Sequence, residues 1–416
     1  MISVEEALTR ILNFVNVLGT EDKHLLDCLG QVLAEDVYST INVPPEDNSA
    51  MDGYALKAED ILSASFEYPK TLQVIGELPA GTANRLRIDP GTSIRIMTGA
   101  ILPEGADVVV PFEDTDEQDH KYKSNCTHEI NIYRNLTAGT NIRRCGEDIT
   151  SGELIISQGK ILHPADIGLI ASVGKEVVSV TCRPLVGILV TGNEVVDINK
   201  PLSPGKIYNS NAYSLAAQVV KYGGIPKLLG IAPDNMEQLS MAIRRGLDCD
   251  MLITSGGVSK GDYDIVKDVL ANEGDISFQT VRMKPGKPLA FGTFNHNGRK
   301  VPHLGLPGNP VSSMITFEIF ARPAIFKMMG KKDLIRSTVK AVMEDSVKNS
   351  DCRRIFDRVI VMKREDKYFA RLTGPQGSGI LSSMVKANGL AIIPETVEQI
   401  EPGTIVDVIL LNEDEN

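Results

Sequence analysis

A carboxylate follows directly after an apolar, strand-like run near the middle of the chain. Val186–Val190 is continuously apolar and leads into TGNE at 191–194, so Glu194 is predicted at the carboxyl end of a strand. A carboxylate in that position can bind a divalent cation or act on a substrate. The alternative is a solvated turn residue, because the loops that follow strands are polar in most proteins.

A second strand-like run, 251–255, continues into the string TSGGVSKGDYD at 254–264. Its Ser255, Gly256 and Gly257 would let main-chain N–H groups approach an anion. The carboxylate of Asp264 could hold a divalent cation that bridges phosphates. The alternative is a tight strand-to-helix turn in which an Asp caps the helix.

Two further loops combine proline with lysine or glycine. MKPGKP at 283–288 places Lys284 and Lys287 around a rigid turn, and two ammonium groups at a strand end suit an oxyanion or phosphate. GLPGNP at 305–310 places Pro307 and Pro310 before a helix, which would make a rigid floor for a ligand. The alternative for the first loop is that its lysines are solvated surface residues. The alternative for the second is that its prolines only begin the following helix.

Two acids lie outside the strand-and-helix region, at the two ends of a segment that we expect to be inserted into a helical one. Asp52 stands in NSAMDGYA at 48–55, where a helical pattern gives way to short β-type runs. Asp148 stands in NIRRCGEDI at 141–149, where the β-type runs end. Each acid neighbours a glycine, so turn formation is the simpler explanation for either one alone.

Carboxylates, two lysines and glycine-rich loops together describe a site for phosphates and a cation. The six cysteines form no CxxC pair and the six histidines form no HExxH motif, so the sequence gives little support to zinc or disulfides. No Ser-His-Asp order and no reactive cysteine context appears either.

The composition limits the classes of partner. The chain has 416 residues, and its 43 basic and 54 acidic residues give a net charge of −11. An acidic chain without an apolar run of about 18 residues is not expected to bind nucleic acid or to span a membrane. Ser3 and Glu6 form a capping box for an N-terminal helix, which indicates a folded start and a cytoplasmic protein.

Alternation of strands and helices marks the central region as a parallel α/β sheet with helices on both faces. In such a sheet, ligands bind at the carboxyl ends of the strands. Short β-type runs occupy about 53–140, and β-type alternation returns at 335–416. The predicted strands are 186–190, 227–231, 251–255, 277–283, 289–292 and 301–306, and the predicted helices are 162–174, 212–222, 236–246, 263–272 and 310–329.

Eight strings of the sequence resemble the molybdopterin molybdenumtransferase family, the MoeA-type relatives of the gephyrin E-domain. They run in order from residue 47 to residue 379, so the resemblance covers essentially the whole chain. The strings are DNSAMDGYA (47–55), RIMTGAILPEGAD (95–107), IRRCGEDI (142–149), TGNEV (191–195), TSGGVSKGDYD (254–264), MKPGKPLAFG (283–292), GLPGNPVSS (305–313) and GPQGSG (374–379).

The resemblance implies a multidomain α/β plus β subunit in a homodimer. A discontinuous helical domain would comprise 1–45 and 147–178, and an inserted β-rich domain would comprise 53–140. A central α/β parallel-sheet molybdopterin-binding domain would follow at 179–330. A C-terminal β-barrel-like domain would occupy 335–416.

The resemblance also implies an enzyme of molybdenum cofactor biosynthesis. Members of this family transfer molybdenum from molybdate into adenylylated molybdopterin and release AMP, with Mg²⁺ as cofactor. Further implied partners are a molybdopterin adenylyltransferase and the apo-molybdoenzymes that receive the cofactor.

The resemblance also implies roles for individual residues of this sequence. The acidic positions implicated in the active site match Asp52, Asp148, Glu194, Asp234 and Asp264, of which Glu194 and Asp264 would bind the metal. Substrate-binding positions match Ser255, Gly256, Gly257, Lys284, Lys287, Pro307 and Pro310. In the C-terminal domain they match Ser378 and Arg353, with Arg354 as the alternative register. Asn193 stands where relatives often carry Asp.

Two other functions remain open at this stage. A molybdopterin adenylyltransferase shares the α/β domain, although its loop after the Gly-Gly pair usually begins Gly-Thr-Gly and it lacks the inserted domain. A non-enzymatic scaffold like gephyrin is the second alternative, and the presence of all the acids and lysines argues against it.

Overall fold

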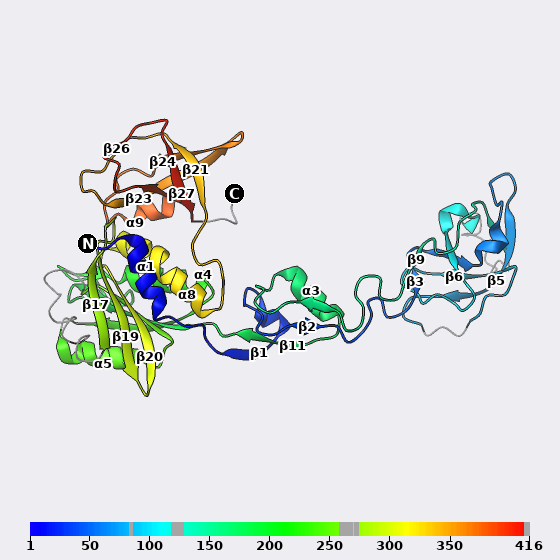
Figure 1. The fold of residues 1–416 in the computed structure, drawn as a ribbon, viewed down its shortest axis with the longest axis horizontal. Coiled ribbons are helices and arrows are strands. Elements are labelled where there is room, and N and C mark those ends of the chain that lie inside the picture. The colour runs from blue at the N-terminus through cyan, green and yellow to red at the C-terminus, as the bar shows by residue number, and fades with distance from the viewer. Residues whose placement is uncertain (83–85, 118–128, 234, 258–268, 270–273, 412–416) are drawn as a thin grey trace. The chain divides into compact units, whose positions relative to one another are not determined.

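The computed structural model describes residues 1–82, 86–117, 129–233, 235–257, 269 and 274–411, and these form two compact units. Asp234, Asp264 and most of the helix predicted at 263–272 lie outside the described residues. One unit consists of residues 1–23, 30–34 and 179–416, and the other of 24–29 and 35–178. Figure 1 shows the elements of both units with their labels. The predicted domain boundaries stay predictions.

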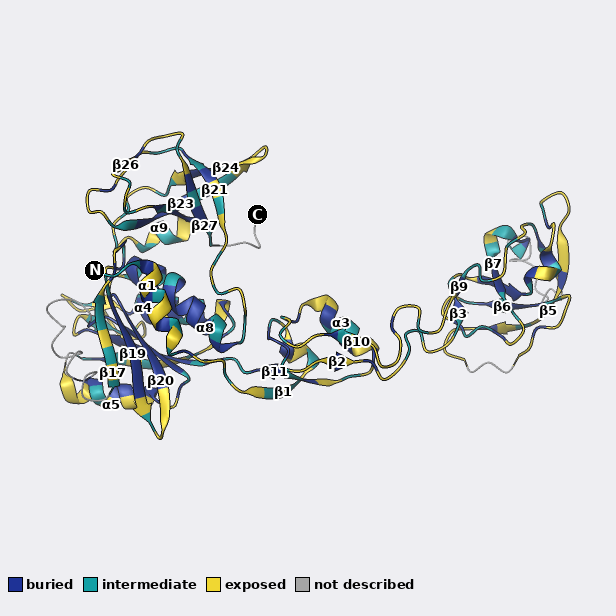
Figure 2. Cartoon of the chain, in the orientation of Figure 1, coloured by how far each residue is buried: buried dark blue, intermediate teal, exposed yellow. Residues whose placement is uncertain are grey.

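A six-stranded sheet forms the centre of the first unit. Val186, Ile188 and Leu189 on its second strand are buried, and they alternate between two apolar cores on opposite faces of the sheet. The α/β class is therefore confirmed, and Figure 2 shows the inner strands as buried. In order across the sheet, the strands are β15 (Ile225–Ala232), β12 (Leu185–Thr191), β16 (Met251–Ser255), β20 (Arg299–Leu306), β19 (Pro288–His296) and β17 (Gly274–Thr280).

Helices cover both faces of this sheet. Leu215 of α4 (Ser210–Lys221) shares a core with Val186 and Ile188. Leu239 of α5 (Met236–Gly246) shares the opposite core with Leu189. On the first face, α1 (Val4–Asn13) and α8 (Arg322–Met328) complete the same core. Ser3 caps α1 as predicted, because its hydroxyl accepts a hydrogen bond of 3.0 Å from the Glu6 amide.

One strand of the sheet, β19, runs opposite to the other five and so differs from the all-parallel prediction. β15, β12, β16 and β20 are parallel, whereas β19 is antiparallel to both β20 and β17. The reason is the short connection between β19 and β20, which turns at Asn297 and Gly298, both with positive φ. Asn-Gly favours a two-residue hairpin, and a parallel pair would have needed a helical crossover.

The helix predicted at 310–329 is continuous but not regular. It begins as α7 (Pro310–Thr316), widens to a π-helical turn at Phe317–Ala321, and continues as α8. Pro323 explains the widened turn, since its ring has no N–H and would clash with a carbonyl one turn earlier.

The C-terminal region forms a closed five-stranded barrel, which confirms the predicted barrel-like class. The sheet closes because its first and last barrel strands pair with each other, from Ile355↔Ile393 to Val359↔Gly389. In order around the barrel, the strands are β23 (Arg354–Arg364), β24 (Lys367–Leu372), β21 (Thr338–Met343), β27 (Ile405–Leu410) and β25 (Gly389–Ile393). The short strands β22 (Val347–Lys348) and β26 (Gln399–Ile400) pair beside it, and α9 (Leu381–Lys386) precedes β25.

Several contacts attach the barrel to the α/β sheet, and two of them lie at the ends of the linker. The short strand β18 (Met283–Lys284) pairs in parallel with the start of β23, rather than continuing β17 as predicted. Near the other end of the linker, the Arg336 guanidinium contacts the buried Glu318 carboxylate at 2.7 Å and donates to the carbonyl of Leu410. The Tyr222 hydroxyl donates to the same carboxylate at 2.6 Å.

The second unit contains the inserted β-rich region. Tyr54 and Ala55 of β4 are both buried, on opposite faces of a five-stranded sheet. The sheet order is β7 (Val108–Pro111), β4 (Gly53–Leu56), β6 (Thr92–Ile96), β5 (Lys70–Leu78) and β8 (Glu129–Ile132). Other elements of this unit are the pairs β3 (Asn48–Ser49) with β9 (Ile142–Arg143) and β2 (Val37–Tyr38) with β10 (Leu154–Ile156), and helix α3 (Pro164–Ser172). β1 (Thr20–His24) and β11 (Val177–Thr181) carry the chain across the unit boundaries.

Among the described residues, the helices are all too short or too polar to cross a membrane.

One acid buried in the barrel makes its stability depend on pH. Asp357 on β23 is 6% exposed, and burial raises its pKa from 3.8 to about 6, although Arg358 and Lys284 oppose the rise. The folded state therefore binds a proton that the unfolded state has already lost, so stability falls as the pH rises from about 4 through 6.

We expect Asp357→Asn to raise the free energy of unfolding by up to about 3 kcal/mol at pH 8 and by clearly less at pH 5. Urea unfolding at both pH values measures the effect. The exposed Asp366→Asn in the turn between β23 and β24 is the control for the loss of one carboxylate from the barrel. An equal effect of Asp357→Asn at both pH values would rule out this account of the burial.

Candidate functional site

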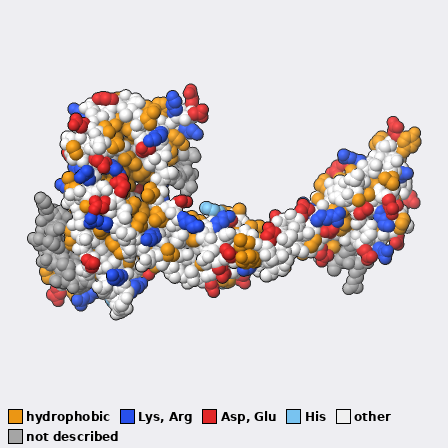
Figure 3. Space-filling view, in the orientation of Figure 1, with side chains coloured by type: hydrophobic (Ala, Val, Ile, Leu, Met, Phe, Trp, Pro, Cys, Tyr) orange, Lys and Arg blue, Asp and Glu red, His pale blue; other side chains and the backbone are white. Residues whose placement is uncertain are grey.

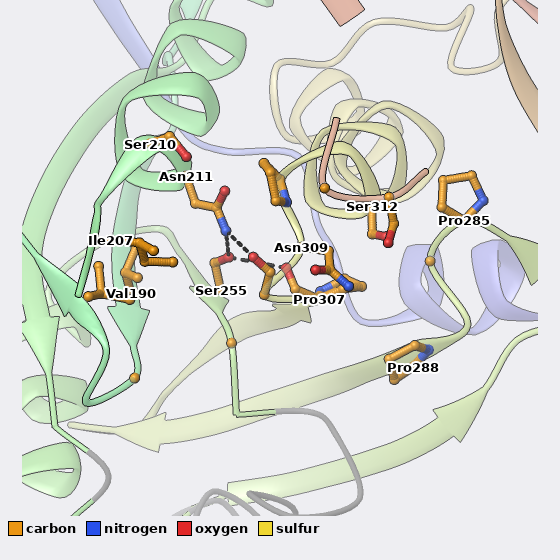
Figure 4. Close-up of a pocket in the computed structure, with 18 of the residues that line it drawn as sticks. Val190, Ile207, Ser210, Asn211, Ser255, Pro285, Pro288, Pro307, Asn309 and Ser312 are labelled. Carbon is orange, nitrogen blue, oxygen red and sulfur yellow. Dashed lines mark hydrogen bonds between the residues drawn. The ribbon is translucent and has the colours of Figure 1, made fainter. Parts of the chain in front are cut away.

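A cavity of about 890 Å³ opens at the carboxyl ends of the parallel strands in the first unit. Its size suits a ligand as large as a nucleotide or a drug molecule. Figure 4 shows part of its lining. The lining segments are 190–192 and 194–195 after β12, 207–211 at the start of α4, 255–257 after β16, 284–288 after β18, 307–310 and Ser312 after β20, Arg353, and the loop 376–379.

The fold explains why segments so far apart in sequence meet here. β12, β16 and β20 are adjacent and parallel, so the loops after Thr191, Ser255 and Leu306 leave the sheet at one edge. The pairing of β18 with β23 adds Lys284 and Arg353 from beside the barrel. The sheet edge alone would have supplied only one side of the cavity.

Most of the predicted site residues line this one cavity. They come from six different loops and supply one carboxylate, three cations and a set of small or rigid residues. They are Glu194, Ser255, Gly256, Gly257, Lys284, Lys287, Pro307, Pro310, Arg353 and Ser378.

Of the two candidate arginines, one lines the cavity and the other does not. Arg353 lines the cavity, and its guanidinium approaches the Met283 carbonyl at 3.5 Å. Arg354 turns the other way and pairs with Glu395 at 3.1 Å and with Glu5.

Two of the predicted acids belong to the second unit and do not line the cavity. Asp52 accepts hydrogen bonds from the Thr98 amide at 2.7 Å and from its hydroxyl at 2.8 Å, which lower the pKa of this carboxyl. Asp148 is exposed and follows β9, and its amide donates to the Val43 carbonyl at 3.0 Å. Because β3 and β9 are antiparallel, the residues that follow each strand lie at opposite ends of the pair, so these two acids are not brought together within their unit.

Two glycines let main chain and carboxylate approach closely. A Cβ at Gly192 would lie 2.6 Å from Glu194 Oε2, so the carboxylate rests against this glycine. A Cβ at Gly256 would lie 2.6 Å from the Thr191 carbonyl oxygen, and both glycines have positive φ. The chain therefore needs glycine here for the two loops to meet.

A buried amide that sequence reasoning missed locks three of the loops together. Asn211 Nδ2 donates to Ser255 Oγ at 2.9 Å and to the Gly308 carbonyl at 2.7 Å. Ser255 Oγ in turn donates to the Pro307 carbonyl at 3.2 Å. Figure 4 shows these bonds at the base of the cavity. Asn211 is the second residue of α4 after the cap Asn209, which is the only local signal it gave.

A second missed residue, Arg358, holds the barrel loop of the cavity. Its guanidinium is fully buried and donates to the carbonyls of Gln376 at 3.2 Å and Gly377 at 3.0 Å, and to Ser383 Oγ at 3.0 Å. Its amide donates to Gln376 Oε1 at 2.9 Å. The signal in the sequence was an Asp-Arg pair inside an otherwise apolar strand, because such charges stay buried only when they are paired.

The charge of the lining suits an anion. Its acidic and basic residues within the described chain are Glu194 against Lys284, Lys287 and Arg353. No group of three or more His, Cys, Asp and Glu side chains that could hold a metal occurs among the residues described. Its described lining therefore combines positive charge, glycine loops and one carboxylate.

Three family models match successive parts of the chain. They are the MoeA N-terminal region (domains I and II) over residues 2–174, a probable molybdopterin-binding domain over residues 187–327, and the MoeA C-terminal region (domain IV) over residues 340–411.

Full-length relatives agree with this assignment. The chain is 38% identical to molybdopterin molybdenumtransferase 2 of Mycobacterium tuberculosis (strain CDC 1551 / Oshkosh), over 92% of this chain and 93% of the relative. It is 34% identical to the molybdopterin molybdenumtransferase of Bacillus subtilis (strain 168), over 99% and 95%. The crystal structure of a molybdopterin biosynthesis MoeA protein from Pyrococcus horikoshii OT3 matches with a TM-score of 0.79 and 30% identity, over 99% of this chain and all of that one.

Replacement of Arg358 should loosen the cavity loop more than the rest of the barrel. In Arg358→Lys one charge remains, but the carbonyls of the loop lose their planar partner, so we expect a loss of about 2 kcal/mol in stability. Hydrogen exchange should rise most at residues 376–379. The exposed Arg371→Lys on β24 is the matched control, and an equal rise over all barrel strands would contradict a specific role in the loop.

Proposed function

The chain belongs to the molybdopterin molybdenumtransferase (MoeA) family, and on this premise we propose that its cavity transfers molybdenum from molybdate into adenylylated molybdopterin with release of AMP. The observation that carries the proposal is the convergence of Lys284, Lys287 and Arg353 on one cavity beside the glycine loop at 255–257. Both substrates are anions, and a site for two anions needs more positive than negative charge.

The cations would act by offsetting repulsion. Molybdate is a dianion and the adenylylated substrate carries phosphates, so bringing them together in water is unfavourable. The two ammonium groups and the guanidinium line one cavity, and positive charge placed there would stabilise the negative charge that develops during transfer. Gly256 and Gly257 have no side chains, so a phosphate can approach the main chain there.

The base of the cavity would fix the orientation of the ligand. The hydrogen bonds from Asn211 to Ser255 and Gly308 connect α4, the end of β16 and the loop at 307–310. Pro307 and Pro310 restrict the main-chain angles of that loop on either side. A rigid base keeps the reacting groups aligned, which lowers the entropic part of the barrier. No side chain of the cavity needs to form a covalent intermediate.

We propose Mg²⁺ as the cofactor, held by Glu194 and Asp264 together with ligand oxygens. The donor set fits this ion, because Mg²⁺ in phosphate-transfer sites takes one or two carboxylates and keeps several waters. Glu194 is exposed at the cavity and its carboxylate rests against Gly192, so it has room for a hydrated ion. When bound, the ion would polarise the adenylyl phosphate.

The oligomeric state, the location in the cell and the protein partners are proposed on the same premise. We propose a cytoplasmic homodimer that receives its substrate from a molybdopterin adenylyltransferase and passes the cofactor to apo-molybdoenzymes. Basic and acidic side chains alternate over the face drawn in Figure 3, which supports the absence of a nucleic-acid partner. We also propose that Asp52, Asp148 and Asp234 have the catalytic role that the family resemblance implies.

The two alternative functions are weaker. An adenylyltransferase would not need the inserted domain and the barrel, whereas the full-length relatives that carry both are named as molybdenumtransferases. A scaffold would not need the charged cavity. ATP-dependent adenylylation of molybdopterin by this chain would support the first alternative, and peptide binding without any turnover would support the second.

Removal of the Glu194 carboxylate, the one acid in the described lining of the cavity, should stop the reaction without unfolding the protein. We expect Glu194→Ala to fold normally, because the side chain is exposed, and to lower AMP release at least 100-fold through loss of the metal ligand. A discontinuous assay with adenylylated molybdopterin, molybdate and Mg²⁺ measures the rate. Glu237→Ala, exposed on α5, is the matched control, and undiminished AMP release by Glu194→Ala would remove this residue from the chemistry.

A further inference from the structure

An acid just outside the cavity binds two of its three cations. Asp351 lies in the loop between β22 and β23. Its Oδ2 atom lies 3.7 Å from Lys284 Nζ and also accepts a hydrogen bond from the Arg353 guanidinium. Its Oδ1 atom accepts one from Ser350 Oγ at 3.1 Å. Lys284 and Arg353 line the cavity, whereas Asp351 is not part of its lining.

The three cations therefore differ in how they are neutralised. Lys287 makes no ion pair with any residue that the structure describes, whereas Lys284 and Arg353 share one carboxylate oxygen. Arg353 is further anchored by the Met283 carbonyl, so its position does not depend on Asp351 alone. Lys284 is placed by the pairing of its own strand with β23.

One oxygen between an ammonium and a guanidinium is the contact that an oxygen of a tetrahedral anion would make with the same pair. The Asp351 side chain is 35% exposed and can swing away without opening a core. Exposed ion pairs are weak, so a dianion has enough attraction for both cations to replace the carboxylate.

We propose that Asp351 is an internal counter-anion that competes with the anionic substrate for Lys284 and Arg353 and so sets the affinity of the cavity for molybdate. The inference rests on the proposed function for the identity of the anion, but the competition itself is a property of the binding site. Without ligand, the carboxylate keeps the two cations from repelling each other. With ligand, it lowers the affinity, which allows the anion to leave as well as to enter.

A purely structural role predicts the opposite effect. If Asp351 served only to hold Lys284 and Arg353 in place, its loss would let both side chains move and would weaken anion binding. If it competes, its loss leaves two unneutralised cations facing the cavity and strengthens binding. The sign of the change therefore separates the two roles.

The test is the binding of molybdate, and separately of inorganic sulfate, to the full chain by isothermal titration calorimetry. We expect Asp351→Asn to bind both dianions about three to ten times more tightly at low salt, with most of the gain lost at 0.5 M NaCl. Asp351→Glu should restore the original affinity, and Asp366→Asn controls for the loss of a charge elsewhere on the barrel. In turnover, Asp351→Asn should lower KM for molybdate without raising kcat.

A double variant shows that the effect runs through the cations. In Lys284→Gln the Asp351→Asn substitution should gain clearly less affinity than in the original chain. Unchanged or weaker dianion binding by Asp351→Asn, or an equal gain with and without Lys284, would overturn the proposal. Tighter binding without any AMP release in the original chain would instead leave the competition intact and remove the proposed function.

Discussion

The cavity depends on one short main-chain pairing, that of Met283–Lys284 with Arg354–Ile355. This pairing is parallel and joins strands about 70 residues apart, on opposite sides of the linker to the barrel. It pairs Lys284 with Ile355, so the loop of Lys284 and Lys287 lies against the start of the strand that Arg353 precedes. The barrel loop at 376–379 is held separately, because the Val311 amide donates to the Ser378 carbonyl at 3.1 Å. Without the pairing, the lysine loop would lose its main-chain link to Arg353 and the barrel.

Buried polar groups hold the loops of this site in place, whereas exposed charged groups can contact a ligand. Asn211, Ser255 and Arg358 are buried, and their side chains donate to groups of neighbouring loops, so they fix those loops. Glu194, Lys284 and Lys287 are exposed, so they can meet ions from solution. Buried hydrogen bonds are costly to break when one partner is removed, and this makes the frame rigid while the charges remain free to exchange partners.

Much of the site was predictable because strand ends carry local signals. Glu194, Ser255 and the glycine pair follow apolar runs directly, and a parallel sheet must bring such ends to one edge. The reversed direction of β19 was also predictable in principle, since Asn297-Gly298 is a strong hairpin signal. The pairing of β18 with β23 was not, because it is a long-range contact of two short segments. Arg358 and Asn211 act through bonds to residues distant in the chain, and no local pattern identifies the partners.

Whether the cavity binds molybdate can be measured by anomalous X-ray scattering at the molybdenum edge, from crystals soaked with molybdate. We expect a molybdenum peak inside the cavity, within ion-pair distance of Lys284, Lys287 and Arg353. A peak only at another surface, with this cavity free of molybdenum at a concentration that supports turnover, would contradict it.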